Sequence, residues 1–246
     1  MPWRHISDPY HILVSEIMLQ QTQVERVVPK YERFIKAFPT PKTLADSETS
    51  ELLGLWQGLG YNRRALYLRK AAQQIIERHG GKFPRTLEDI DALPGVGKAT
   101  AGAIMAYAHQ EPSAFIETNV RRVFLHFFFP NGRKVTDERL IPLVERAVDQ
   151  KNPRDWYYAL MDYGTMLKKS VSRNPNRRSA QYAKQSKFEG SNRQIRGRVL
   201  KILLKNKKMS EKRLVSELGD ARAGKNVSQL VSEGFLRREG DSIAIA

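Results

Sequence analysis

The stretch Leu93-Pro94-Gly95-Val96-Gly97-Lys98-Ala99-Thr100-Ala101-Gly102-Ala103 decides the fold. It lies between a short helical pattern at about 86–92 and a longer one at 98–108. Two glycines in so short a connection permit positive φ angles and leave backbone N–H groups uncovered at the start of a helix, an arrangement that binds phosphate oxygens. A purely structural corner between two helices is the alternative. The residues expected to hold a phosphate backbone are Leu93, Gly95, Val96, Gly97 and Lys98.

Helical periodicity continues on both sides of this stretch, and Gly102 is expected to let another helix approach closely. Pro, Gly, Asn and Asp residues separate segments in which apolar residues recur at i, i+3 and i+4. These segments are 9–20, 23–37, 63–78, 98–108, 119–129, 138–149 and 155–167. The pattern predicts an all-α domain of many short helices over residues 1–168.

A polar and basic segment, 169–191, follows and predicts a linker. Apolar periodicity then restarts in three short helical patterns, near 195–203, 214–218 and 227–231. After these, residues 234–245 alternate around Gly240-Asp241, as a β-hairpin does. Residues 192–246 are therefore expected to form a small winged-helix-like domain, with a helical interaction domain as the alternative.

Composition excludes several classes of function. The chain has 246 residues and no cysteine, so a disulfide framework, a thiolate nucleophile, a Cys-ligated zinc and an iron–sulfur cluster are all excluded. No apolar run reaches the roughly 18 residues of a membrane span, and the N-terminus lacks the apolar stretch of a signal peptide. We expect a cytoplasmic, nucleoid-associated protein.

The charge is large and unevenly placed. The formal net charge is +16 at pH 7, which predicts a polyanionic partner, and a foldable sequence favours nucleic acid over a membrane surface. Residues 1–167 carry 22 basic and 19 acidic side chains, whereas residues 168–246 carry 20 basic and 7 acidic ones. Most of the excess therefore lies in the last third of the chain.

Five segments resemble a known family in order along the chain. They are PWR at 2–4, DPYHILVSEIMLQQTQVERVVPKYERFIKAFPT at 8–40, LWQGLGYNRRALYL at 55–68, GGKFPRTLEDIDALPGVG at 80–97 and MDYGTM at 161–166. Together they are similar to the MutY-type adenine DNA glycosylases of the helix-hairpin-helix superfamily, which also contains endonuclease III. The resemblance implies a helix-hairpin-helix glycosylase fold and an enzyme that flips an adenine opposite 8-oxoguanine out of the duplex and hydrolyses its N-glycosidic bond.

Two carboxyl groups carry the implied chemistry. Glu16 stands where the family has its general acid, and its helical neighbours are mostly apolar, so burial should raise its pKa and keep it protonated at neutral pH. Glu117 stands where the family has an Asp, before a helix whose amides and dipole should keep the carboxylate ionised. The extra methylene moves the charge, which puts full activity in doubt. Asn119 resembles the Asn that bonds the catalytic carboxylate.

The position of the lysine predicts the type of reaction. Relatives that also cleave the strand carry a Schiff-base Lys where this chain has Ala99 in the expected base pocket. Lys98 is one residue too early, which on a helix turns the side chain by about 100°. The resemblance therefore implies hydrolysis without strand cleavage.

Other matching positions imply contacts with DNA. Gln20 and Gln21 resemble paired glutamines that enter the duplex at the orphan base, and Tyr61 resembles an intercalating tyrosine. Trp3 and Arg4 resemble residues that line the base pocket. Ordinary aromatic packing for Trp3 and Tyr61, and solvated helix ends for the glutamines, are the alternatives.

The sequence departs from the family in two places. Family members usually follow the MDYGTM-like helix with four cysteines that hold a 4Fe–4S cluster, and here the chain runs through basic residues that could supply charge to DNA. Those expected to contact DNA are Lys168, Lys169 and Arg173; Arg177, Arg178, Lys184 and Lys187 are further candidates. A solubilising linker is the alternative. Residues 192–246 are also too few for the Nudix-like domain that recognises 8-oxoguanine in full-length relatives.

We therefore expect a monofunctional DNA glycosylase of base excision repair. Its partner is expected to be double-stranded DNA with a mispaired or damaged base, and the protein is expected to be a monomer with no cofactor, no metal and no membrane contact. A uracil or thymine mismatch glycosylase, a non-catalytic lesion-binding protein and a winged-helix regulator built on a glycosylase relic are the alternatives.

Overall fold

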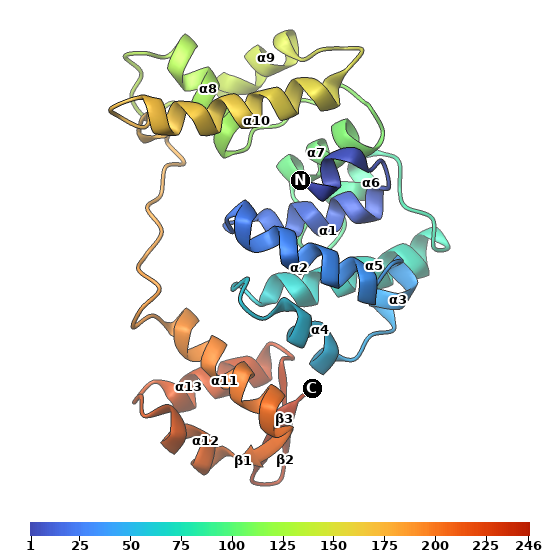
Figure 1. The fold of residues 1–246 in the computed structure, drawn as a ribbon, viewed down its shortest axis with the longest axis vertical. Coiled ribbons are helices and arrows are strands. Elements are labelled where there is room, and N and C mark those ends of the chain that lie inside the picture. Colours follow the sequence, from blue (N-terminus) through green and yellow to red (C-terminus); the bar gives the residue numbers. More distant parts are fainter. The chain divides into compact units, whose positions relative to one another are not determined.

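The structure is a computed structural model that describes residues 1–246, and its elements are mostly helices (Figure 1). Its contacts group the chain into two compact units. The first unit joins Met1–Ile17 to Phe83–Lys184, and the second joins Met18–Lys82 to Gln185–Ala246. The chain thus enters each unit twice. The predicted division along the sequence, into 1–168, 169–191 and 192–246, stays a prediction.

The first unit contains most of the first long helix and the hairpin. Its elements are η1 (Pro2–His5), α1 (Pro9–Leu19, shared at its end with the second unit), α6 (Leu87–Asp91), α7 (Lys98–Ala108), α8 (Thr118–Phe128), α9 (Asp137–Ala147), α10 (Pro153–Ser170) and η2 (Pro175–Arg178). The predicted helices at 9–20, 86–92, 98–108, 119–129, 138–149 and 155–167 are confirmed to within a few residues.

An aromatic cluster in the first unit fixes the extended segment between α7 and α8. The Tyr157 hydroxyl accepts from Phe115 N (3.1 Å) and donates to Ser113 O (2.9 Å), and the rings of Phe115 and Tyr157 stack with centroids 4.0 Å apart. A Cβ on Gly102 would lie 2.7 Å from Phe115 Cβ. The close approach predicted at Gly102 is therefore to this extended segment and not to another helix. The segment leads directly into the N-terminus of α8.

The second unit combines four helices from the first half of the chain with the C-terminal residues. The former are α2 (Val24–Ala37), α3 (Pro41–Ala45), α4 (Thr49–Trp56) and α5 (Arg63–His79); the latter are α11 (Asn192–Asn206), β1 (Lys208–Ser210), α12 (Glu211–Leu218), α13 (Ala223–Ser232), β2 (Leu236–Glu239) and β3 (Ser242–Ile245). The Phe34 and Trp56 rings meet edge to face in the core of the four helices.

The C-terminal residues form three helices on a small antiparallel sheet, as the winged-helix-like prediction requires. The strands lie in the order β1-β3-β2. The hairpin β2–β3 was predicted, whereas β1 was not, because three residues are too short to show a period-2 pattern. Leu203, Leu230, Phe235 and Ile243 are fully buried between helices and sheet.

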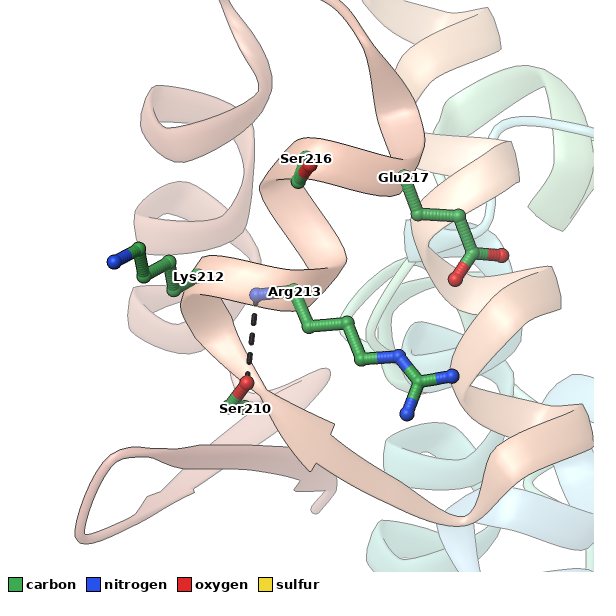
Figure 2. A pocket seen from close by; sticks show the side chains of 5 residues that line it. All are labelled: Ser210, Lys212, Arg213, Ser216 and Glu217. Carbon is green, nitrogen blue, oxygen red and sulfur yellow. Dashed lines mark hydrogen bonds between the residues drawn. The ribbon is translucent and has the colours of Figure 1, made fainter.

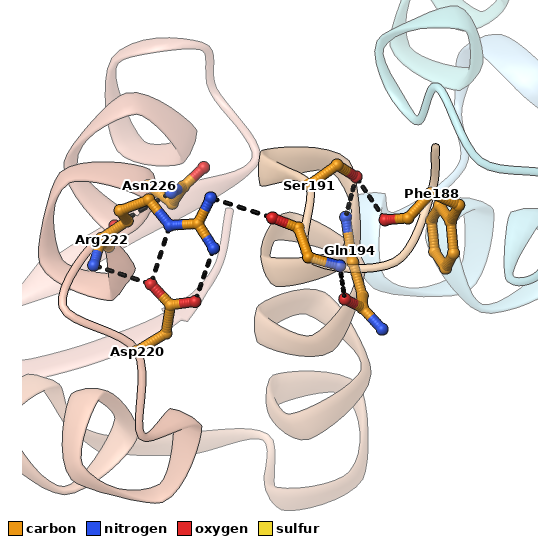
Figure 3. Close-up of polar contacts among 7 residues, drawn as sticks. Phe188, Ser191, Gln194, Asp220, Arg222 and Asn226 are labelled. Carbon is orange, nitrogen blue, oxygen red and sulfur yellow. Dashed lines mark hydrogen bonds and ion pairs between the residues drawn. The ribbon is translucent and has the colours of Figure 1, made fainter. Parts of the chain in front are cut away.

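Polar contacts tie the start of α11 to the turn between α12 and α13 (Figure 3). Arg222 bonds both carboxylate oxygens of Asp220 (2.9 and 2.7 Å) and also donates to Gly190 O (3.0 Å). Ser191 caps α11 by accepting from Gln194 N, and its hydroxyl donates to Phe188 O (2.6 Å). These bonds order the chain just before α11.

No helix is both long enough and apolar enough to cross a bilayer.

Candidate active site

Glu16 lies in the middle of α1 among buried apolar side chains. The residues one turn before it, Ile12 and Leu13, are fully buried, and Glu16 itself is half-buried. Burial is the main cause that raises the pKa of the Glu16 carboxyl to about 8, and repulsion from the charge of Glu117 is the second. The carboxyl is therefore protonated at neutral pH, as predicted.

Glu117 is the N-cap of α8. Its Oε1 accepts from the backbone N–H groups of Asn119 and Val120, the latter at 2.7 Å, and its Oε2 accepts from Asn119 Nδ2 at 3.4 Å. Anions are favoured at this end of a helix. The structure nevertheless corrects one expectation, because burial outweighs these donors and the pKa of Glu117 is raised above its usual value.

The two carboxyls differ in the causes that shift their pKa values. Two backbone amides and the charges of Arg121 and Arg122 lower the pKa of Glu117, partly opposing burial. For Glu16 both causes act upward, and one of them is the negative charge of Glu117. The two carboxyls are therefore coupled through the charge of Glu117.

Asn119 connects the carboxylate to α10. Its Oδ1 accepts from Arg122 Nη1 (2.6 Å), and the same Nη1 donates to Gly164 O (2.6 Å). A Cβ on Gly164 would lie 2.7 Å from Asn119 Cβ and 2.8 Å from Asn119 O. The glycine of the MDYGTM segment is thus required for α10 to pack against the start of α8, which carries Glu117.

Replacing Gly164 with alanine should therefore disturb the carboxylate itself. Because the clash is with the backbone of Asn119, it cannot be relieved by a side-chain rotation, and we expect a loss of about 3 kcal/mol of stability. Displacement of Glu117 should lower single-turnover base excision by about 100-fold. The matched control is Gly54→Ala in α4, where nothing lies within 4 Å of the added Cβ. That change should stabilise by about 0.5–1 kcal/mol. Equal melting temperatures for the two variants would contradict the packing argument.

Two tyrosines that sequence reasoning missed line the same site. Tyr107 of α7 and Tyr158 of α10 stack with centroids 4.6 Å apart and planes 15° from parallel. Burial and then the charge of Glu16 raise the pKa of Tyr158 to about 12, and the same two causes raise the pKa of Tyr107 well above its usual value. The stacked pair makes the surroundings of Glu16 largely apolar, and Tyr107 is itself buried.

Arg4 lies over the ring of Tyr158. Its guanidinium lies 4.8 Å from the centre of the Tyr158 ring and bonds both carboxylate oxygens of Asp162, at 2.8 and 2.6 Å. Trp3, beside it in η1, is buried. Trp3 and Arg4 thus belong to the same unit as the two carboxyls, and their role in holding a base stays a prediction.

The hairpin between α6 and α7 has the predicted backbone. Gly95 has φ of +81°, and Val96 N donates to Leu93 O (3.0 Å) to close the turn. Gly97 is the N-cap of α7, so the amides at 98 and 99 precede the helical ladder, whose first bond runs from Ala101 N to Gly97 O. Leu93 is buried as an anchor, whereas Gly95, Gly97, Lys98 and Ala99 are exposed. Ala99 therefore contributes no functional side chain here, and its place in a base pocket stays a prediction.

The three predicted DNA-opening residues all lie in the second unit, in two strained turns. Gln21 follows α1 with φ of +55°, and Tyr61 precedes α5 with φ of +47°. Positive φ in a residue other than glycine costs about 1–3 kcal/mol and persists only where the surroundings impose it. Gln20 is half-buried and Gln21 exposed.

Arg64 imposes this geometry and was also missed from sequence. It is 8% exposed, and its guanidinium donates to carbonyls on both turns. The bonds run to Met18 O (2.9 Å), Gln20 O (2.6 Å), Thr22 Oγ1 (3.0 Å), Leu59 O (3.2 Å) and Gly60 O (2.9 Å). Burial lowers the pKa of Arg64 to about 10. The signal in the sequence is an arginine pair at a helix N-terminus, where the helix dipole disfavours cations.

The C-terminal residues contact Tyr61 from another direction. Its hydroxyl accepts from Arg193 Nη1 (2.6 Å) and Gln185 Nε2 (2.5 Å), and the Arg193 guanidinium lies 5.0 Å from the ring centre. Next to it, Arg63 pairs with Glu233 (2.6 Å). The Tyr61 side chain is thus already hydrogen-bonded through its hydroxyl, and its insertion into DNA stays a prediction.

The basic segment after α10 is partly ordered against α8. Asn176 Nδ2 donates to Thr118 O (3.0 Å), and Arg178 donates to the carbonyls of Leu125 and Phe129 (2.7 and 3.0 Å). Arg178 is therefore bonded within the fold, and its contribution of charge to DNA stays a prediction. Lys168, Lys169 and Arg173 are exposed, and their contact with DNA stays a prediction. Without cysteine these residues do not fit an iron–sulfur cluster, and η2 with its flanking residues occupies this part of the chain instead.

Comparison with known proteins gives consistent matches. The profile described as HhH-GPD superfamily base excision DNA repair protein matches residues 14–146. An adenine DNA glycosylase of Buchnera aphidicola is 38% identical over 168 residues, which cover 68% of this chain and 48% of that protein. An adenine DNA glycosylase of Mycobacterium tuberculosis is 31% identical over 226 residues, which cover 82% of this chain and 73% of that protein. This chain spans about half of the length of the Buchnera relatives.

Solved structures share the fold. A thermostable thymine-DNA glycosylase superposes with a TM-score of 0.62 at 31% identity, over 71% of this chain and 81% of that one. A non-covalent complex of endonuclease III with DNA gives a TM-score of 0.54 at 20% identity, over 70% of this chain and 78% of that one. The predicted helix-hairpin-helix fold is confirmed.

Proposed function

This chain belongs to the HhH-GPD superfamily of base excision DNA repair proteins, and from that premise we propose that it removes mispaired adenine from DNA by hydrolysis. The observation that carries the proposal is the pairing of Glu16, protonated at neutral pH, with Glu117, an ionisable carboxyl held by two backbone amides. Relatives over 30% identical bear the name adenine DNA glycosylase. The substrate is double-stranded DNA in which adenine lies opposite guanine or 8-oxoguanine.

The residues divide the reaction between them. The flipped adenine is held beside Glu16, which gives its proton to a ring nitrogen of the purine. The C1′–N bond then breaks with its electron pair going to the base, and the carboxylate of Glu117 stabilises the oxocarbenium-like sugar. Water adds its hydroxyl to C1′ and returns a proton to Glu16, so the acid is restored.

The same residues support hydrolysis without strand cleavage. A covalent Schiff base needs an amine in the pocket, and the position after Lys98 is an alanine. The other side chains of the site include no primary amine. They are two carboxyls, two phenols, the Asn119 amide and the guanidinium groups of Arg4 and Arg122. The product is therefore an abasic site in an intact strand.

A second candidate is removal of thymine or uracil from mismatches with guanine. It is favoured by the thymine-DNA glycosylase at 31% identity, whose superposition covers 81% of its own length. A pyrimidine leaves as a stabilised anion and gains less from a proton than a purine does. The acid at Glu16 favours the purine substrate.

One experiment separates these functions. Single-turnover reactions should use duplexes with adenine opposite 8-oxoguanine, adenine opposite guanine, thymine opposite guanine and uracil opposite guanine, each followed by alkali. We expect product from the two adenine duplexes, only after alkali, and no adduct on borohydride treatment. Tight binding without any product would favour a lesion-binding protein, and product from the pyrimidine duplexes alone would favour the second candidate.

A further inference from the structure

Two groups of cations differ in the C-terminal part, residues 191–246. Those of the sheet and of the loop before α13 are neutralised by carboxylates. Arg222 pairs with Asp220, Arg238 with Glu211, Lys208 and Arg237 with Glu239, and Arg196, on α11, with Glu233. On α13 itself, Lys225 is the one lysine or arginine. The face formed by α13 and the hairpin is therefore close to electrically balanced.

The groove between α11 and α12 is different. It is lined by Arg198, Lys201 and Lys205 of α11 and by Arg213 of α12, together with Ile202, Asn206 and Glu217. None of these four cations forms an ion pair, and all four are exposed. Glu217 is the one carboxylate among the lining residues.

The hollow continues over the start of α12. A second depression shares Arg213 and Glu217 with the groove and adds Ser210, Lys212 and Ser216. Figure 2 shows Arg213 and Glu217 extending on one side of α12 and Lys212 on the other. Ser210 caps the helix by accepting from Arg213 N, so the exposed first turn of α12 also offers a hydroxyl and positive helix-end charge.

The spacing of these cations matches a nucleic-acid strand. Residues 198 to 205 span seven positions of a helix, or about 10 Å at 1.5 Å per residue. One strand of B-form DNA carries a phosphate every 3.4 Å of axis, so about three phosphates face that length. Unpaired cations held this close repel one another, and a row of phosphates removes the repulsion while releasing counterions.

We propose that the groove lined by Arg198, Lys201, Lys205 and Arg213 binds the phosphate backbone of duplex DNA without reading its sequence. The balanced face of α13 and the hairpin contributes less. The proposal rests on the proposed function for its partner, because the duplex is the same molecule that carries the mispaired base. It goes beyond that function by giving the C-terminal part a defined surface.

The test compares two triple variants of the full chain that change the net charge equally. Lys201→Gln/Lys205→Gln/Arg213→Gln removes groove cations, and Lys208→Gln/Arg237→Gln/Arg238→Gln removes ion-paired ones. Affinity for an undamaged duplex is measured by fluorescence anisotropy across a salt series. We expect the groove variant to bind about 10- to 100-fold more weakly at 0.1 M salt, with a log–log salt slope smaller by 2 to 3, and the control to change by less than about threefold.

A single substitution that is expected to raise duplex affinity distinguishes the proposal from a loss of folding, because an unfolded variant would not bind more tightly. Glu217→Gln removes the carboxylate from the groove and should tighten duplex binding and steepen the salt slope. An unchanged groove variant, equal losses in both triple variants, or no gain from Glu217→Gln would overturn the proposal. So would loss of binding to phosphatidylglycerol vesicles with duplex affinity intact, which would assign the groove to a membrane.

The outcomes also separate this proposal from the proposed function. Excision at saturating enzyme depends on the carboxyl site and should be the same in all three variants and the parent. If the parent excises no base but the groove variant still loses duplex affinity, the glycosylase assignment fails and the groove stands.

Discussion

Replacing Glu16 with glutamine should abolish excision, leave duplex binding within about threefold, and stabilise the protein above neutral pH. Glutamine keeps the shape and cannot give up a proton, and a general acid contributes about 10²- to 10⁴-fold in rate. In the unchanged protein, excision should also fall about tenfold per pH unit above pH 8, as Glu16 loses its proton.

The effect on stability follows from the raised pKa. The folded carboxyl titrates at about 8 instead of 4.5, so between these values the folded state holds a proton that the unfolded state has lost. The stabilising contribution is complete below pH 4.5 and is lost as the pH rises through 8. Its slope is about 1.4 kcal/mol per pH unit, which gives an upper bound of about 5 kcal/mol.

Urea unfolding at pH 5 and pH 8.5 measures this difference. The stability of Glu16→Gln relative to the parent should rise by several kcal/mol between the two pH values, whereas Glu25→Gln, at an exposed position of α2, should show no such rise. A constant difference would mean that Glu16 is ionised in the folded protein. It would then be unsuited to protonate a purine.

Arg64→Met should be the most damaging single change in the second unit. Methionine fills much of the space of the stem, but it removes the arginine donor from four carbonyls, those of Met18, Gln20, Leu59 and Gly60. Gly60 O keeps a bond from Trp56 Nε1 (3.2 Å), and Gln20 O and Leu59 O keep the long contacts of Thr22 Oγ1 (3.3 and 3.4 Å). Unsatisfied buried acceptors cost about 1–3 kcal/mol each, partly recovered by water, so we expect a loss of about 3–4 kcal/mol. The turns that hold Gln21 and Tyr61 should then relax from positive φ.

Arg69→Met provides the matched control on the same helix. Arg69 donates to Ser47 O and Thr49 Oγ1 (both 3.0 Å), and neither acceptor lies in a predicted DNA-opening turn. Both variants should lower the melting temperature, but only Arg64→Met should slow base flipping, followed with 2-aminopurine beside the target base at a temperature where both variants are folded. If Arg69→Met slows flipping equally, Arg64 has no positioning role. Arg64→Lys should recover part of the stability and little of the flipping rate, because one ammonium cannot reach both turns.

Sequence patterns predicted the long elements well and the short ones poorly. Amphipathic helices such as α2 and α9 carry their own periodicity, and the hairpin glycines required one local conformation. The five residues of α3 and the three of β1 are too few to show a period, and they form because Thr40 caps one and β3 pairs with the other. Local sequence patterns therefore predict the longer helices, whereas the shortest elements form because of capping and pairing that such patterns do not show.

The candidate site was predictable only in part, for a similar reason. The carboxyls Glu16 and Glu117 could be predicted from the resemblance and from the apolar neighbours on their own helices. Tyr158 reaches Tyr107 from a helix 51 positions later, and no local pattern encodes that contact. The raised pKa of Glu117 was also missed, because the number of amide donors is visible in a helix N-terminus but the burial around it is not.

The way the chain enters each unit twice has a consequence for biosynthesis. Residues 18–82 leave the ribosome early, yet their partners Arg193 and Glu233 are made more than a hundred residues later. The first unit likewise cannot be complete until residues up to 184 have been synthesised. Contacts across such separations form slowly, and domains that fold during synthesis do so as completed units. The second unit should therefore complete its fold only once residues 185–246 have been synthesised, although its first segment is made early.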